Sequence, residues 1–153
     1  MDVIETWDVN VSYTNTLLKN FDLNPSKYSD ITNVRVFEII NNEQVALQQI
    51  FEEKYYVDKG CYYALPVSNN PSKFEIAWHV GLDNSSDNKI YKLHYTIKDA
   101  TRIYKDCTEF YWQFLGRNNS IPGKNITGTI KLPKEVSDID KLKAVSYTHL
   151  RAH

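Results

Sequence analysis

Two carboxylates stand beside aromatic residues in the stretch DCTEFYW at positions 106–112. Such a set is typical of a glycoside hydrolase, in which one acid protonates the leaving oxygen and the other acts as base or nucleophile. Asp106 and Glu109 are therefore the candidate catalytic residues, and with Asp99 their oxygens could also ligate a hard cation. The simpler interpretation places both acids on a solvated edge, paired with nearby basic residues such as Arg102. We favour the simpler one, and so predict neither an enzyme nor a metal site.

Adjacent tyrosines occur twice, at 55–56 and at 62–63. Because neighbouring side chains on a strand point to opposite faces, one tyrosine of each pair should face solvent. Tyr56 and Tyr62, together with Trp112, are the candidate binding residues, since exposed rings can stack on the sugars of a polysaccharide. Aromatic residues of a β-sandwich more often fill the space between its sheets, and we expect this of the three tryptophans.

Histidines and cysteines give weaker indications. His79 and His94 alternate with apolar neighbours in two separate segments, which predicts that both face solvent. Two histidines without a third ligand predict no metal site. Cys61 and Cys107 could form a disulfide in an oxidising compartment, or stay two buried small side chains. The sequence has no phosphate-binding loop and no zinc-protease motif, so we predict no cofactor.

The composition is that of an ordinary globular domain. The chain has 153 residues, of which 42% are hydrophobic and 24% charged, and its formal net charge is −1. This length suits one domain. A nucleic-acid-binding protein needs an excess of Lys and Arg, so the near-neutral charge predicts no nucleic-acid partner. The sequence has no run of about 18 apolar residues that could span a bilayer.

Alternation of apolar and polar residues is the dominant pattern, and it predicts strands. At 91–97, Tyr, Leu, Tyr and Ile alternate with polar residues and predict a strand with one buried face. Runs rich in Asn, Asp and Ser, including 83–88, predict turns. Further strands are expected at 4–13, 34–40, 74–80 and 126–132. The fold class is therefore mainly β: a β-sandwich, immunoglobulin-like or jelly-roll-like, with a short helical turn as an alternative near 99–108.

Three segments in fixed order connect the chain to a known family: YTIKDA at 95–100, EFYWQFLG at 109–116 and ITGTIKLP at 126–133. Weaker pieces upstream are VIETW at 3–7 and FEIAW at 74–78. Together these motifs resemble the N-terminal ectodomain of the DUF2207 family, predicted bacterial membrane proteins of the YciQ-like kind. The resemblance extends over most of residues 1–133.

The resemblance implies an extracytoplasmic, β-rich domain of a protein anchored in the bacterial cell membrane, so the membrane is the expected partner of the full-length parent. It implies no activity, because none is established for the family. We therefore expect a non-catalytic interaction or structural domain at the cell surface. Two alternatives stay open: a module that binds envelope polysaccharide through exposed aromatic rings, and a glycoside hydrolase-like enzyme with an acid pair.

The two ends of the chain look cut. The string VSYTHLRAH at 145–153 resembles a translated sequencing adapter, so residues 144–153 are predicted to be a non-native tail. Family members have further sequence on both sides of the matched region, including a signal peptide and a membrane anchor. We therefore expect residues 1–143 to form a single β-sandwich ectodomain that is truncated at both ends.

Overall fold

The computed structural model describes residues 1–24, 28–55, 58–110 and 112. These residues lie in the first of two compact units, Met1–Pro122. The second unit, Gly123–His153, lies outside the described residues, and so do the strand expected at 126–132 and the expected tail at 144–153. Strands account for 75% of the described residues and none of these residues is helical, which confirms a mainly β fold.

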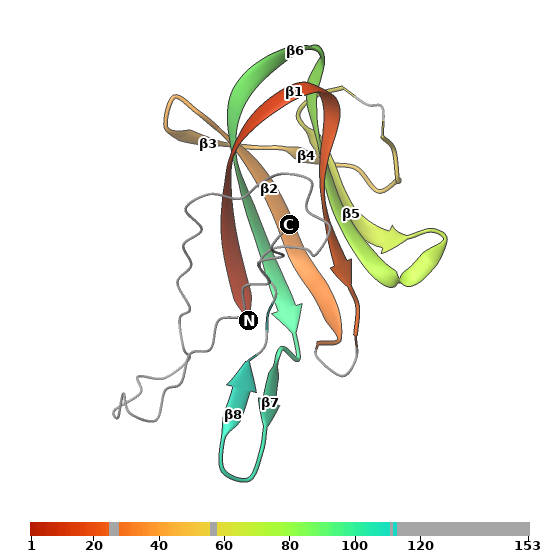
Figure 1. The fold of residues 1–153 in the computed structure, drawn as a ribbon, viewed down its shortest axis with the longest axis vertical. Coiled ribbons are helices and arrows are strands. Elements are labelled where there is room, and N and C mark those ends of the chain that lie inside the picture. The colour runs from red at the N-terminus through yellow and green to blue at the C-terminus, as the bar shows by residue number, and fades with distance from the viewer. Residues whose placement is uncertain (25–27, 56–57, 111, 113–153) are drawn as a thin grey trace, which may run out of the picture. The chain divides into compact units, whose positions relative to one another are not determined.

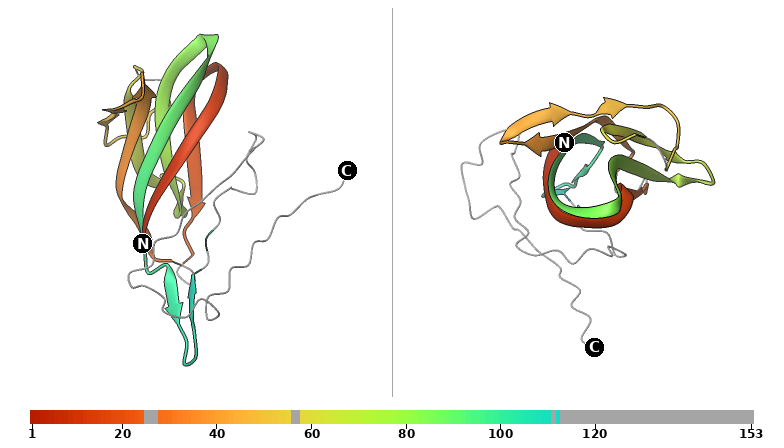
Figure 2. Two further views of the ribbon diagram at one scale, coloured as in Figure 1. Left: turned by 90° about the vertical axis from the view of Figure 1, so that its left-hand side faces the viewer. Right: turned by 90° about the horizontal axis from the view of Figure 1, so that it is seen from above.

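Two long strands form the frame of the fold. β1 (Asp2–Asp22) pairs antiparallel with β6 (Asn70–Lys98) along nearly its whole length. Both strands arch over at one end, as Figures 1 and 2 show. The arch lies where the register shifts after Ser12, next to Tyr13 and Gly81, whose φ angles are 49° and 66°. Extra residues in one strand of a pair bend it and increase its twist. Each long strand thus contributes two halves that face each other.

The other strands extend the sheet from the two halves of β6. β2 (Asp30–Ile40) pairs with its second half and carries β3 (Glu43–Ala46) at its outer side. β5 (Cys61–Val67) pairs with the first half, and the short β4 (Gln48–Gln49) lies parallel to β5. The six strands therefore form one sheet that curls into a nearly closed barrel. Within this unit one curled sheet provides the two facing layers that a sandwich would build from two sheets.

Alternate residues of the long strands fill the inside of the curl. Trp78, Ile76, Leu93 and Ile97 have no exposed surface, and the Trp7 ring meets the Trp78 ring edge-on at 5.3 Å. The alternation expected at 91–97 is confirmed, because the apolar residues there point inward. The dense packing of large rings explains why the sheet closes around them.

The predicted turn at 83–88 is wrong. These residues belong to β6, which runs through them as one strand of 29 residues. Backbone pairing with β1 continues on one side of the arch, where the Asn10 Nδ2 donates to Asn88 Oδ1 at 2.8 Å. The polar side chains at 83–88 are exposed, so the sheet loses no core contact by continuing through a turn-like sequence.

The short helical turn considered near 99–108 does not form. β7 (Thr101–Ile103) and β8 (Thr108–Phe110) instead make a separate two-stranded hairpin. The Tyr104 N–H donates to the Cys107 carbonyl oxygen at 2.7 Å and closes its turn. The helical stripe would need Ile103 to be buried, but this side chain is 83% exposed. The β-branched and aromatic residues of the segment favour strands instead.

Candidate functional site

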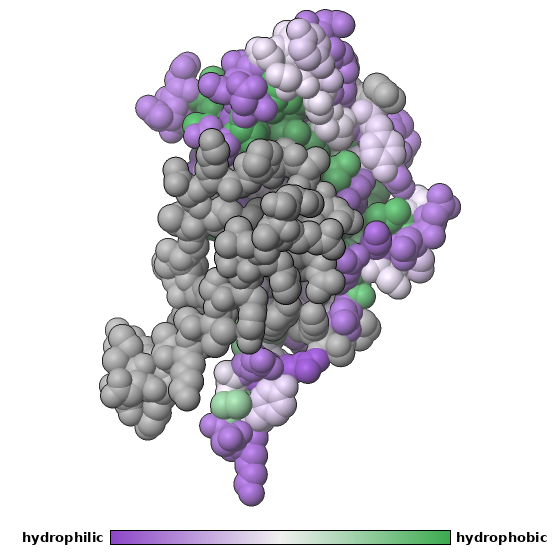
Figure 3. Space-filling view, viewed as in Figure 1, coloured by the Kyte–Doolittle hydropathy of each residue, from purple (hydrophilic) through white to green (hydrophobic). Residues whose placement is uncertain are grey.

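The acid pair lies on the β7–β8 hairpin. Asp106 stands in its turn and Glu109 on β8, and both are exposed. Glu109 faces Arg102 in the register, and its Oε2 accepts a hydrogen bond from the Tyr104 hydroxyl at 3.3 Å. The tip of the hairpin is hydrophilic in Figure 3. Within the described residues, no three His, Cys, Asp or Glu side chains are arranged to hold a metal ion.

The tyrosines are not placed as expected. Tyr56 lies outside the described residues. The prediction that one tyrosine of the 62–63 pair faces solvent is wrong, because Tyr62 is 4% and Tyr63 1% exposed. The Tyr62 hydroxyl donates to the Val34 carbonyl oxygen at 2.9 Å inside the curl. Tyr63 points to the outer face, where the Tyr55 ring packs edge-on against its ring. The Tyr63 hydroxyl donates a hydrogen bond to Glu75 Oε1 at 2.6 Å.

Trp112 is half-buried in an aromatic cluster. Its ring lies 5.2 Å from Tyr28, 5.9 Å from Phe21 and 6.2 Å from Tyr95, measured between centroids. Its contacts are thus those of a core residue at the edge of the barrel, in agreement with the core role expected for the tryptophans. Both cysteines are free: Cys61 is half-buried in β5 and Cys107 is exposed in the hairpin turn.

His79 was expected to face solvent, and this prediction is wrong: the side chain is 1% exposed. Residues of the segments 50–55 and 58–60 lie against this part of the sheet, where the Gly60 N–H donates to the His79 carbonyl oxygen at 3.1 Å. Tyr55 is one of these residues, and its carbonyl oxygen accepts a hydrogen bond from the Thr16 hydroxyl at 2.7 Å. The same hydroxyl lies 2.9 Å from His79 Nδ1, while Nε2 is buried without a partner. Burial lowers the pKa of His79.

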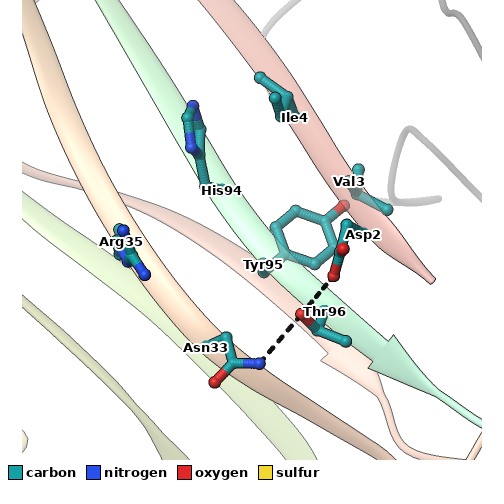
Figure 4. Close-up of a pocket in the computed structure, with 8 residues that line it drawn as sticks. All are labelled: Asp2, Val3, Ile4, Asn33, Arg35, His94, Tyr95 and Thr96. Atoms are coloured by element: carbon teal, nitrogen blue, oxygen red, sulfur yellow. Dashed lines mark hydrogen bonds between the residues drawn. The ribbon is translucent and has the colours of Figure 1, made fainter.

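An open pocket of about 430 Å³ lies on the outer face where β1, β6 and β2 run side by side. This volume is within the range of small-molecule sites. Figure 4 shows the central strand carrying His94 and Thr96, with β2 on one side and β1 on the other. The lining residues are Asp2, Val3, Ile4, Asn33, Arg35, His94, Tyr95 and Thr96.

A chain of hydrogen bonds crosses one end of this pocket. The Asn33 Nδ2 donates to Thr96 Oγ1 at 3.2 Å, and the Thr96 hydroxyl donates to Asp2 Oδ1 at 2.6 Å. Asn33 lies in the register shift between Thr32 and Arg35 with φ 53°, a left-handed conformation that Asn accepts more readily than most residues. The bulge thus aims the Asn33 amide at the neighbouring strand.

The other end of the pocket carries positive charge. Arg35 is exposed opposite His94, and it takes part in none of the ion pairs found within the described residues. The His94 ring lies 4.9 Å from that of Phe37, and its Nε2 is buried without a partner. Burial, and then the charges of Lys92 and Arg35, lower the pKa of His94. The lowered pKa favours the neutral imidazole.

Sequence reasoning missed the charged pair inside the curl. The Lys19 Nζ lies 2.9 Å from Glu5 Oε1, with 7% and 12% of the side chains exposed. The Tyr95 hydroxyl and, at 3.1 Å, the Trp7 indole N–H also donate to the Glu5 carboxylate. One signal was available: Glu5 is in phase with the apolar residues of its strand, so the alternation already places it on the inner face.

Comparison with known proteins gives one match. The model of the DUF2207 family, described as a predicted membrane protein N-terminal domain, matches residues 1–152. No curated protein and no solved structure matches the chain. In the described part of the chain there is no helix with the length and apolar character needed to cross a membrane. The chain belongs to the DUF2207 family of predicted membrane proteins and carries that family's N-terminal domain.

Proposed function

We propose that this domain is a non-catalytic interaction module on the extracytoplasmic face of a membrane-anchored bacterial protein. The observation that carries the proposal is the outer-face pocket, in which an exposed guanidinium and a fixed chain of hydrogen-bonding groups share one wall. Family membership supports the membrane-anchored parent. On a sheet surface of this kind the hydrogen-bonding groups are in place before a ligand arrives, so affinity depends on how well the ligand complements them.

The rigidity of the wall supports this function. Its residues come from three paired strands, and the central strand β6 is hydrogen-bonded on both sides along the pocket. The opposite face of the same strands is the packed core, where Val36, Leu93 and Ile97 are buried. The strand backbones and the hydrogen-bonded side chains of Asn33, Thr96 and Asp2 therefore lose little conformational entropy when a ligand binds.

The hydrolase alternative has weaker support. A glycoside hydrolase needs one carboxyl that stays protonated, which is achieved by a site that keeps water away from the acid. Asp106 and Glu109 are exposed on the β7–β8 hairpin. We expect the chain to release no reducing ends from bacterial envelope glycan. Hydrolysis by the chain that disappears in Glu109→Gln would overturn the non-catalytic assignment.

Polysaccharide binding through a row of rings is also weaker. Trp78, Tyr62 and Tyr63 are buried, and Trp112 packs against other rings. Among the described residues, the exposed aromatic side chains belong to different segments: Tyr13 to β1, Phe51 and Tyr55 to the 50–60 segment, and Tyr104 to the hairpin turn. A sugar chain stacks best on rings that share one face.

Cysteine labelling of the full-length parent tests the proposed location. Cys107 is exposed, so a membrane-impermeant maleimide should label it in intact cells, and Cys107→Ser should remove that labelling. Cys61→Ser is the matched control and should leave most of the labelling in place, because Cys61 is half-buried. Labelling of Cys107 only after the cells are lysed would contradict the extracytoplasmic location.

A further inference from the structure

We propose that the outer-face pocket binds a short zwitterionic peptide, with its carboxylate on Arg35 and its ammonium on Asp2. This inference deepens the proposed function and rests on it. The two charges have opposite signs and lie on opposite sides of β6, on the strands β2 and β1 (Figure 4). Residues that bind one charge only would not need this arrangement.

Arg35 selects a planar anion. A guanidinium donates two parallel hydrogen bonds to a carboxylate, and such charge-assisted bonds are about twice as strong as neutral ones. No described acid competes with the ligand, since Arg35 is in none of the ion pairs found there. The fixed negative charge of Asp2 disfavours a ligand with two negative charges, so a carboxylate suits the pocket better than inorganic phosphate.

Asp2 provides the site for the ammonium. Its Oδ1 accepts a hydrogen bond from the Thr96 hydroxyl. This bond fixes the carboxylate at the rim of the pocket and leaves Oδ2 for the ligand. The Asn33 Nδ2 in turn donates to the Thr96 hydroxyl oxygen. The other side-chain atom of this amide, Asn33 Oδ1, can accept a peptide N–H of the ligand. The neutral His94 between the two charges repels neither end of the ligand.

The spacing of the strands sets the length of the ligand. Neighbouring strands lie about 4.8 Å apart, so β2 and β1 are separated by about 9.6 Å across β6. Arg35 pairs with His94 and Asp2 with Thr96, so the two residues are also offset by about 7 Å along the strands, and their Cα atoms lie roughly 12 Å apart. The Asp2 side chain turns towards β6, where it meets Thr96, and the long Arg35 side chain can cover part of the remaining distance. An extended dipeptide spans about 7 Å, whereas a free amino acid spans half of that. Ile4, which is 66% exposed, offers apolar contact to a small side chain of the peptide.

Titration of the chain with three probes, followed by NMR of the backbone amides, tests the assignment. Ala-Ala has both charges, N-acetyl-Ala-Ala lacks the ammonium and Ala-Ala amide lacks the carboxylate. We expect saturable shifts for Ala-Ala at millimolar concentrations, confined to pocket residues such as Ile4, Arg35 and Thr96. Each modified probe should bind about tenfold more weakly, the loss of one charge-assisted contact. Equal binding of all three probes, or tighter binding of inorganic phosphate, would overturn the inference.

Substitutions assign the two ends. Arg35→Gln should weaken Ala-Ala about tenfold but leave the already weak Ala-Ala amide unchanged. Asp2→Asn should weaken Ala-Ala and leave N-acetyl-Ala-Ala unchanged. The matched control is Arg102→Gln, an exposed arginine on β7 outside the pocket, which should bind all probes like the original chain. An unchanged thermal midpoint shows that each variant is folded.

The inference and the proposed function can fail separately. Labelling of Cys107 in intact cells, together with no saturable shift for Ala-Ala, would overturn the peptide ligand and leave the extracytoplasmic location standing. Saturable Ala-Ala binding that Arg35→Gln weakens, together with labelling only after lysis, would support the ligand and overturn the location.

Discussion

Glu5 and Lys19 lie on the same strand, and yet their side chains form an ion pair with the Lys19 Nζ 2.9 Å from Glu5 Oε1. They meet because β1 arches over and its two halves face each other inside the curled sheet (Figure 2). The Lys19 Nζ also lies 5.9 Å from the centre of the Trp7 ring and 5.2 Å from that of Phe21. This pair therefore depends on the curvature of the whole sheet.

Removal of one partner should be costly. Lys19→Met would leave the Glu5 carboxylate buried without its counter-charge, and breaking a buried ion pair in this way costs about 3–5 kcal/mol. We expect a loss near the lower end of this range, because 12% of the Glu5 side chain is exposed. Urea unfolding measures it. The control is Lys54→Met in the exposed Lys54–Glu52 pair, which should cost less than about 1 kcal/mol. Equal losses would contradict a structural role for the inner pair.

Gly81 is required at the arch for two reasons. Its φ is +66°, and an added Cβ would lie 2.8 Å from the Cβ of Lys59. Gly60 provides the matched comparison, because its φ is +89° but nothing lies within 4 Å of an added Cβ. A left-handed conformation costs an L-residue roughly 1–2 kcal/mol, and overpacking adds about 1 kcal/mol or more. Gly81→Ala should thus lower the free energy of unfolding by about 1 kcal/mol more than Gly60→Ala. The two thermal midpoints check this order.

Tyr62 should behave as a core residue. Tyr62→Phe removes the hydroxyl that donates to the Val34 carbonyl oxygen, and the loss of such a buried hydrogen bond costs about 1 kcal/mol. Tyr13→Phe, at a position 74% exposed, is the control and should change stability by less than about 0.5 kcal/mol. If Tyr62→Phe also leaves the urea midpoint unchanged, the hydroxyl bond contributes nothing to the fold.

Acidification should destabilise the domain through its buried histidine. Burial lowers the pKa of His79 below its ordinary value of 6.5, so the unfolded chain binds the proton first as the pH falls. The free energy of unfolding therefore has its full value above about pH 6.5. It declines as the pH falls further, towards the pKa of His79 in the folded state. His94 shifts in the same direction. Urea midpoints at pH 7.5 and about pH 5 measure the decline.

His79→Gln is the variant that assigns this pH dependence. It should reduce the decline between about pH 7.5 and pH 5 to the part due to His94, even if it lowers stability at both values. The exposed carboxyl groups of Glu53 and Asp87 have pKa values below their ordinary 4.5 and 3.8, so they contribute little in this window. A decline of the same size in His79→Gln would show that another group is responsible.

The sequence by itself determined the fold class, the family and much of the core. Strict alternation reports which face of a strand is buried, so the inward positions of Tyr91, Leu93, Tyr95 and Ile97 could be predicted. The motifs at 95–100 and 109–116 gave the family resemblance, which the match over residues 1–152 confirms. Both signals are local: they depend on residues near one another along the chain.

Only the tertiary structure decided which outer faces are covered and which distant residues share a site. Tyr62 and His79 could not be placed from alternation, because both faces are buried at Tyr62 and Tyr63 of β5 and between Phe74 and Val80 of β6. The pocket brings Asp2, Arg35 and His94 together from three strands, and their register is set by bulges that no local pattern specifies. Local sequence fixes the direction in which a side chain points along a strand, whereas its neighbours depend on how that strand bends and pairs.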